Sequence, residues 1–195
     1  MTMPFDAMND TPDEALLVLY ANGDRIAARA LVMRLTPRVL GYAARLLDDP
    51  AEAEDVAQEA MLRLWKIAPE WRQGEARVTT WLYRVVTNLC TDRLRKKRTV
   101  ALDAVPEPED DRASAADGMV QVERAMALKA GLATLPERQR QAVVLRHLEG
   151  ATNPEIAQIL KISVEAVESL TARGKRALKA ALADRRPELG YSDDE

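Results

Sequence analysis

The sequence predicts an all-α protein in which a flexible acidic linker joins two small helical domains. Nearly half of the residues are apolar, and Ala and Leu, two strong helix formers, supply much of this share. Large apolar residues recur at helical spacing in two stretches of the chain, and the segment between them contains prolines and few large apolar side chains. The alternation of apolar and polar residues that is typical of strands is not visible.

The first domain is expected over residues 13–98, after a flexible N-terminus of residues 1–12. Between Asp13 and Leu47 apolar residues follow helical spacing, and the turn Asn22-Gly23-Asp24 divides this stretch into two helices. Pro37 lies near the start of a new turn, after which the apolar pattern continues.

Two more helices complete this domain. Asp48-Asp49-Pro50 predicts a helix start, because proline suits the first helical turn, and the helix is expected to stop near Ala68-Pro69. A polar loop over residues 70–77 follows. The next helix opens with Thr79-Thr80 and ends in a basic cluster at Arg98.

The linker is expected over residues 99–118, which are acidic and contain two prolines. The second domain is expected over residues 119–186, and residues 187–195 form a polar, flexible tail. Within this domain one helical pattern begins at Met119, and a further helix starts at Leu135-Pro136-Glu137.

The sequence at the end of the second domain predicts a helix-turn-helix. Thr152 caps a short helix through Leu160, Lys161-Ile162 makes a turn, and Ser163 caps a longer helix. An ordinary αα-hairpin would show the same spacing. A run of cations on the longer helix favours a DNA-binding role, because cations neutralise phosphates, although such runs are also found on solvated helix faces.

Composition excludes several classes of protein. Cys90 is the only cysteine and His147 the only histidine, so neither an intrachain disulfide nor a Cys/His zinc site is expected. No phosphate loop or nucleophile–base pair is visible, so we expect no catalytic residues, no cofactor and no small-molecule substrate. The N-terminus lacks signal-peptide features and no apolar run could span a membrane, which predicts a cytoplasmic protein without membrane insertion. Cys90 is interpreted as a core residue, and His147 as structural or exposed.

Charge is unevenly distributed along the chain. The formal net charge is −3, which by itself argues against a nucleic-acid binder. However, residues 79–98 carry six basic residues against Asp92, whereas residues 99–117 carry six acidic ones against Arg112. This segregation indicates separate tasks for the two segments.

Three segments in order resemble the sigma-70 superfamily, specifically the extracytoplasmic-function (ECF) group. Residues 51–66 (AEAEDVAQEAMLRLWK) resemble region 2.2, and residues 80–95 (TWLYRVVTNLCTDRLR) resemble regions 2.3 and 2.4. Leu135-Pro136-Glu137-Arg138-Gln139-Arg140, with the later Glu155-Ile156-Ala157 and Val167-Glu168-Ser169, resembles region 4. The resemblance covers roughly residues 14–98 and 120–182 and implies sigma regions 2 and 4.

The resemblance implies roles for residues of region 2. A polar helix face would dock on the clamp helices of the largest subunit of core RNA polymerase, and it consists of Asp55, Gln58, Glu59 and Arg63. An unstacked base of the −10 element would enter a pocket that contains Trp71 and Asn88. Basic side chains would follow the DNA backbone there: Arg84, Arg93, Arg95, Lys96 and Arg98. The other readings are a solvated helix face for the first set and a loop anchor for Trp71, while Trp81 and Tyr83 are interpreted as packing.

The resemblance also assigns −35 DNA contacts in region 4, namely Glu168, Ser169, Arg173, Lys175 and Arg176. Glu168 and Leu170 depart from the family pattern, because both positions are usually basic. A carboxylate can accept a hydrogen bond from a cytosine amino group but is repelled by phosphates. Glu168 therefore either reads a specific base or weakens the −35 contact.

The function that the resemblance implies is transcription initiation from the promoters of a stress or signal regulon. The expected partners are core RNA polymerase (clamp helices and flap), promoter DNA and an anti-sigma factor. The alternative is a stand-alone helix-turn-helix regulator with a helical partner-binding domain. The basic helix ending at Arg98 favours the sigma factor, because a sensor domain has no need of a second DNA surface.

Overall fold

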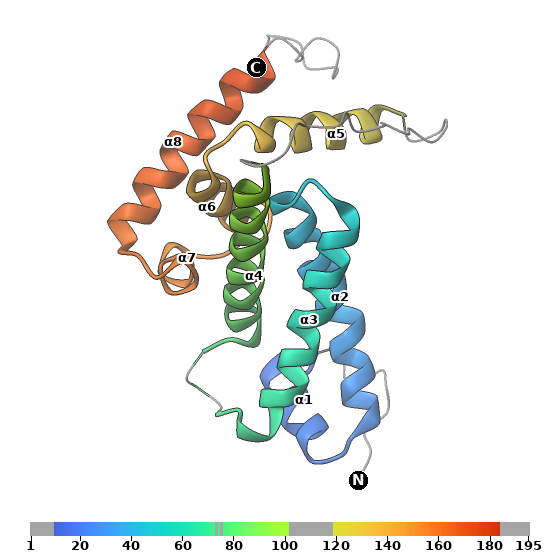
Figure 1. Cartoon of the computed structure of the whole chain (residues 1–195). Helices are drawn as coiled ribbons and strands as arrows, with labels where there is room; N and C mark the ends of the chain where they lie inside the picture. Colours follow the sequence, from blue (N-terminus) through green and yellow to red (C-terminus); the bar gives the residue numbers. More distant parts are fainter. Residues whose placement is uncertain (1–9, 73, 75, 102–118, 184–195) are drawn as a thin grey trace.

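The computed structural model describes residues 10–72, 74, 76–101 and 119–183, and every regular element in this part of the chain is helical (Figure 1). The N-terminal domain consists of α1 (Asp13–Ala21), α2 (Arg25–Leu46), α3 (Pro50–Ile67), the short 3₁₀ helix η2 (Ala68–Glu70) and α4 (Val78–Ala101). The C-terminal domain consists of α5 (Met119–Ala133), α6 (Glu137–His147), α7 (Asn153–Leu160) and α8 (Val164–Leu182). The all-α prediction is confirmed. The N-terminal residues 1–9, most of the predicted linker (102–118) and the predicted tail lie outside the described residues.

Local signals set the beginnings of the helices in the N-terminal domain. Asp24 accepts hydrogen bonds from the amides of Ile26 and Ala27, and Asp49 caps α3 in the same way, with Pro50 in the first turn. Gly23 has a φ of +92°, a left-handed conformation that glycine adopts without steric cost. The predicted breaks before α2 and α3 are confirmed.

Two helices continue past positions where the sequence predicts a new turn or a helix end. Pro37 lies inside α2, which continues unbroken to Leu46, although a proline there removes one helical hydrogen bond. Burial of apolar residues on both sides of it, Leu35 and Val39, supports the uninterrupted helix. In addition, α4 extends to Ala101 and so includes the first three residues of the predicted linker.

The N-terminal domain is built around a continuous apolar core between α1, α2, α3 and α4. Leu16, Leu31 and Leu64 are fully buried in it. Tyr42 is also buried, and its hydroxyl lies 2.8 Å from the hydroxyl of Thr87 on α4, so its polar atom is paired inside the core. This arrangement fixes the faces that α3 and α4 turn outward.

The C-terminal domain contains the predicted helix-turn-helix. Thr152 and Glu155 form a reciprocal capping box at the start of α7, and Lys161 makes the following turn with a φ of 53°. Ser163 then accepts a hydrogen bond from the amide of Ala166 and begins α8. These two caps confirm the interpretation as a short helix, a tight turn and a longer helix.

The two domains pack against each other. The short helix α7 contacts α4, and α6 contacts α2, so α4 lies between its own domain and the C-terminal helices (Figure 1). Among the described residues, no helix is long and apolar enough to cross a membrane.

Candidate polymerase and promoter interfaces

The polar face of α3 is turned to solvent as the sequence predicts. Asp55, Gln58 and Arg63 are exposed and Glu59 is half-buried, with an ion pair between Glu59 and Arg63 one turn apart. On the opposite side of the helix, the apolar residues Val56, Ala60 and Leu64 are completely buried in the core. The helix therefore presents a polar surface that is available to a partner.

An apolar groove of about 430 Å³ lies beside this polar face, between α2 and α3. Its lining combines aliphatic and aromatic side chains with three polar ones: Val32, Thr36, Leu40, Glu54, Ala57, Gln58, Met61, Leu62 and Trp65. Val32 and Leu62 are 43% and 58% exposed, unusual values for large apolar residues. Sequence reasoning missed this groove; the signal was Leu62, an apolar residue on the outer face of an otherwise amphipathic helix.

Polar and basic residues form a stripe along α4. Arg84, Asn88, Arg95 and Arg98 follow one another at intervals of four, seven and three residues, which places them on one face of the helix. Asn88, Arg95 and Arg98 are exposed and Arg84 is half-buried. We call these four residues, together with Thr91 between them, the α4 stripe.

Two of the basic residues predicted to contact −10 DNA, Arg93 and Lys96, lie outside the α4 stripe. Arg93 is half-buried, and its guanidinium donates a 2.9 Å hydrogen bond to the Glu52 carbonyl and lies 3.8 Å from the Asp55 carboxylate. It therefore connects α4 to α3 within the domain. Lys96 is exposed beside the stripe.

A pocket of about 350 Å³ opens near the N-terminal end of α4. Its lining residues come from the segment before the helix and from its first turns: Ile67, Glu70, Trp71, Arg72, Ala76, Trp81 and Arg84. The rings of Trp71 and Trp81 meet edge to face, with centroids 6.2 Å apart and an interplanar angle of 89°. The predicted partner of Trp71, Asn88, is not among these lining residues and lies one turn beyond Arg84 on the same face of α4.

The environment of Trp71 combines both sequence interpretations. The ring is half-buried and packs against the core, as expected for a loop anchor, yet it also lines the pocket. Its indole Nε1 is buried and has no hydrogen-bond partner among the described residues. A buried donor without a partner carries an energetic cost, and such donors mark places where a ligand acceptor could bind.

The outer face of α8 carries all of the residues predicted for −35 recognition. These exposed residues are Glu168, Ser169, Arg173, Lys175 and Arg176. The side-chain amide of Asn153, at the start of α7, donates a hydrogen bond of 3.5 Å to Glu168. In contrast, Leu170 is half-buried and packs against the core. Of the two departures from the family pattern, only Glu168 therefore lies on the exposed face of α8.

Cys90 and His147 occupy the places predicted for them. Cys90 is completely buried, and burial raises the pKa of its thiol to about 12. His147 is exposed near the end of α6, where partial desolvation and the cations Lys175 and Arg146 lower its pKa. No group of side chains able to hold a metal ion occurs within the described residues.

Comparisons with known proteins agree with these features. Residues 31–100 match the family model of sigma-70 region 2, and residues 125–178 match that of sigma-70 region 4. The ECF RNA polymerase sigma factor SigM of Mycobacterium tuberculosis is 36% identical over 180 residues, covering 91% of this chain and 88% of that protein. The ECF RNA polymerase sigma factor SigW of Bacillus subtilis is 30% identical over 173 residues, covering 83% of this chain and 92% of that protein.

A solved structure, that of CnrH in complex with the cytosolic domain of CnrY, is 25% identical to this chain with a TM-score of 0.65, and the match covers 88% of this chain and 97% of that one. The region 2 match disfavours a stand-alone helix-turn-helix regulator, because it assigns the N-terminal domain to the initiation machinery as well. The chain therefore belongs to the sigma-70 family and is an RNA polymerase sigma factor of the ECF group, a transcription initiation factor whose partners are core RNA polymerase and promoter DNA.

Proposed function

We propose that this sigma factor captures an unstacked base of the −10 element in the pocket between Trp71 and Trp81. The α4 stripe then follows the backbone of the same DNA strand. The pocket supports this proposal because it offers two aromatic rings, the Arg84 guanidinium and an unpaired indole donor in one place. Its volume of about 350 Å³ lies in the range of small-ligand sites.

The proposal rests mainly on where the pocket lies along α4. The pocket lies at the N-terminal end of the α4 stripe, and Arg84 belongs to both. Extracting a base from the stack costs a few kcal/mol, and stacking on an aromatic ring contributes about 1–3 kcal/mol per base. Because the cations follow directly along the helix, they would hold the strand that supplies the base on one side of that base. Asn88, just outside the pocket, would contact the neighbouring nucleotide.

The other exposed surfaces would make the remaining contacts with polymerase and with the −35 element. We assign the exposed polar face of α3 and the adjacent groove to the clamp helices of the largest polymerase subunit, and the C-terminal domain to the flap. The exposed face of α8 would enter the major groove of the −35 element, where Ser169 and Arg173 reach the bases and Lys175 and Arg176 reach phosphates.

Control by an anti-sigma factor belongs to the same proposal. The solved structure of CnrH is a complex with the cytosolic domain of CnrY, and the exposed apolar groove between α2 and α3 is a surface on which a partner helix could pack. We infer that this factor acts in the cytoplasm, where its polymerase is located, and that release from such a partner directs polymerase to the promoters of a stress or signal regulon.

The test is open-complex formation with core polymerase on a promoter selected from genomic DNA by run-off transcription. Promoter opening is followed with a fluorescent base analogue in the −10 element. Trp71→Ala should reduce the amount of open complex by about tenfold, because a stacking contact of about 1–3 kcal/mol is lost. Trp71→Phe, which keeps an aromatic surface, should retain most of the activity.

Binding to core polymerase is the necessary control. Both variants should compete for core polymerase as well as the wild type, because α3 is unchanged. Equal loss of polymerase binding and of promoter opening in Trp71→Ala would mean that the domain has misfolded. Full promoter opening by Trp71→Ala would refute the pocket assignment.

A further inference from the structure

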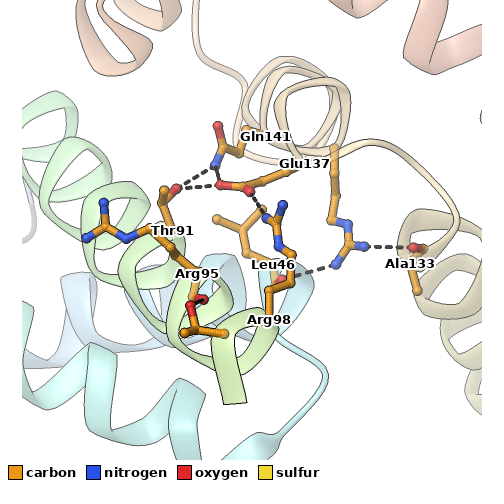
Figure 2. Close-up of polar contacts among 9 residues, drawn as sticks. Leu46, Thr91, Arg95, Arg98, Ala133, Glu137 and Gln141 are labelled. Atoms are coloured by element: carbon orange, nitrogen blue, oxygen red, sulfur yellow. Dashed lines mark hydrogen bonds and ion pairs between the residues drawn. The ribbon is translucent and has the colours of Figure 1, made fainter. Parts of the chain in front are cut away.

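The two ends of α4 are held by different parts of the chain. Towards its C-terminal end, Thr91 and Arg98 donate hydrogen bonds of 2.6 and 2.7 Å to the carboxylate of Glu137 on α6 (Figure 2). At its N-terminal end, the amide of Val78 donates a 2.9 Å hydrogen bond to the carboxylate of Glu14 on α1, 64 residues earlier in the chain. The contact with Glu14 therefore lies entirely within the N-terminal domain.

The helix α4 begins without a cap from its own segment. Arg77 occupies the cap position, because its carbonyl accepts a 3.1 Å hydrogen bond from the amide of Trp81 one turn later. An arginine side chain has no hydrogen-bond acceptor, and the first turn of α4 contains no acidic residue. The first amides of a helix have no partner within the helix, so they need an acceptor from elsewhere. Glu14 supplies an anionic acceptor, which the positive end of the helix dipole also favours.

Glu14 is held in place by contacts that do not involve α4. Leu16, two residues later on α1, is completely buried in the core. Arg34 on α2 donates hydrogen bonds to the carbonyl of Thr11 at 2.7 Å and to the carboxylate of Asp13 at 3.2 Å. The Arg34 and Asp13 side chains are only 26% and 17% exposed, so this contact is partly shielded from water. The helix α1 is therefore anchored on its own side of the domain.

Both walls of the aromatic pocket depend on α1. Trp71 directly follows η2, which contacts α1, and the amide of Trp71 donates a 3.2 Å hydrogen bond to the carbonyl of Ala68 in η2. Ala76 and Trp81 also line the pocket, and they lie two residues before and three residues after Val78. A shift of the Val78 backbone would therefore move Ala76 and Trp81 relative to Trp71.

We propose that Glu14 is a positioning residue for −10 recognition. By binding the amide of Val78, it sets the spacing between Trp81 and Trp71, and so determines how well one base fits the pocket. Recognition sites need their groups held within about 0.5 Å of the productive geometry, and supporting contacts of this kind provide that precision. Glu14 itself does not touch the DNA. This inference rests on the proposed function in taking the pocket of Trp71 as the site of the −10 base.

The first test measures promoter opening by the full chain with core polymerase. The templates carry each of the four bases at the most strongly selected −10 position. Glu14→Ala should reduce opening on the preferred base by about tenfold, an effect of the size expected for a lost helix cap. Opening on the other three bases should fall less, so the base preference becomes narrower. Glu14→Gln, whose amide oxygen can still accept the Val78 hydrogen bond, should retain most of the opening and of the preference.

The second test needs neither DNA nor polymerase. Hydrogen exchange of the Val78 amide is followed by nuclear magnetic resonance in the free, full-length protein. Exchange should be about tenfold faster in Glu14→Ala, because the amide loses its acceptor and the start of α4 frays more often. In Glu14→Gln it should stay close to the wild-type rate.

Two control variants separate positioning from a general loss of stability. Asp10→Ala removes an exposed carboxylate just before α1 and should change neither base preference nor Val78 exchange. Ala53→Gly destabilises the completely buried start of α3, next to the Glu52 carbonyl that binds Arg93. It should lower the urea midpoint of the domain while leaving the base preference as in the wild type.

The possible failures can be told apart. Wild-type Val78 exchange in Glu14→Ala would overturn the proposal, and so would a narrowing of base preference in Ala53→Gly as large as that in Glu14→Ala. Faster Val78 exchange with unchanged base preference in Glu14→Ala, alongside the expected defect of Trp71→Ala, would refute the role of Glu14 and leave the pocket assignment standing. Full promoter opening by Trp71→Ala would instead refute the pocket itself.

Discussion

The hydroxyl of Tyr83 on α4 donates a 2.7 Å hydrogen bond to the carboxylate of Glu149, which lies 66 residues later in the chain. Both groups are largely removed from water. Burial raises the pKa of Tyr83 above its usual range, and the hydrogen bond to Glu149 adds to that shift. This hydrogen bond joins region 2 to region 4, and it pairs the buried Tyr83 donor with a buried acceptor.

Tyr83→Phe removes the donor and leaves the buried Glu149 carboxylate with fewer partners. We expect the free energy of unfolding to fall by about 1–3 kcal/mol, the usual cost of an unsatisfied buried group. Urea denaturation followed by circular dichroism measures this change. Tyr20→Phe, which keeps the ring contact with Trp65, is the matched control. An equal effect of the two substitutions would mean that the Tyr83 hydroxyl contributes nothing specific.

Gly174→Ala should destabilise region 4. A Cβ at this buried position of α8 would lie 2.6 Å from a methyl group of Val143 and 3.2 Å from the carbonyl oxygen of Gln139 on α6. Overpacking of this kind costs about 1–3 kcal/mol, and the better helix propensity of alanine offsets up to about 1 kcal/mol of it. A lower thermal midpoint is therefore expected.

A second substitution tests the steric origin of this loss. Val143→Ala makes room for the new methyl group, so the double variant should be less destabilised than the sum of the two single variants. Strict additivity of the two effects would show that Val143 is not the obstacle.

Stability should decline above about pH 9 through Cys90. The pKa of its thiol is 9.0 in the reference state and about 12 in the folded protein, mainly because of burial. Between these values the unfolded chain releases a proton that the folded protein keeps, so the free energy of unfolding falls by up to about 1.4 kcal/mol per pH unit. Tyr42 and Tyr83, whose pKa values burial also raises, add to the decline above about pH 10.

Cys90→Ala isolates the thiol. In this variant the decline should begin about one pH unit later, because only the tyrosines contribute. Urea unfolding at several pH values from 8 to 11 makes the comparison, roughly over the range of these reference pKa values. Parallel curves for the wild type and the variant would contradict the assignment.

Glu168 is expected to read a base in the −35 element. Its carboxylate is exposed on the outer face of α8, and the amide of Asn153 lies within 3.5 Å of it. A carboxylate that accepts from a cytosine amino group contributes about 1–3 kcal/mol of discrimination. Glu168→Ala should therefore reduce the preference for cytosine at one −35 position by about tenfold or more, as measured by promoter selection. Tighter binding to all sequences alike would instead show that Glu168 only repels phosphates.

The sequence by itself determined the helical class of the fold, the starts of α2, α3, α7 and α8, and the helix-turn-helix. Asp24, Asp49, Thr152 and Ser163 each bind amides two or three residues away, so the signal and the structure that it specifies lie in one short stretch. The same holds for the amphipathic α3, whose buried side and polar side follow directly from the spacing of its residues.

Only the tertiary structure decided which side chains meet. It paired Arg93 with α3, turned Leu170 inward, placed Arg84 rather than Asn88 in the pocket of Trp71, and brought apolar residues of α2 and α3 together as an exposed groove. The contact between Arg45 and Glu149 spans 104 residues, and that between Thr91 and Glu137 spans 46. No local pattern encodes such pairs, because the partners approach each other only after whole helices have packed.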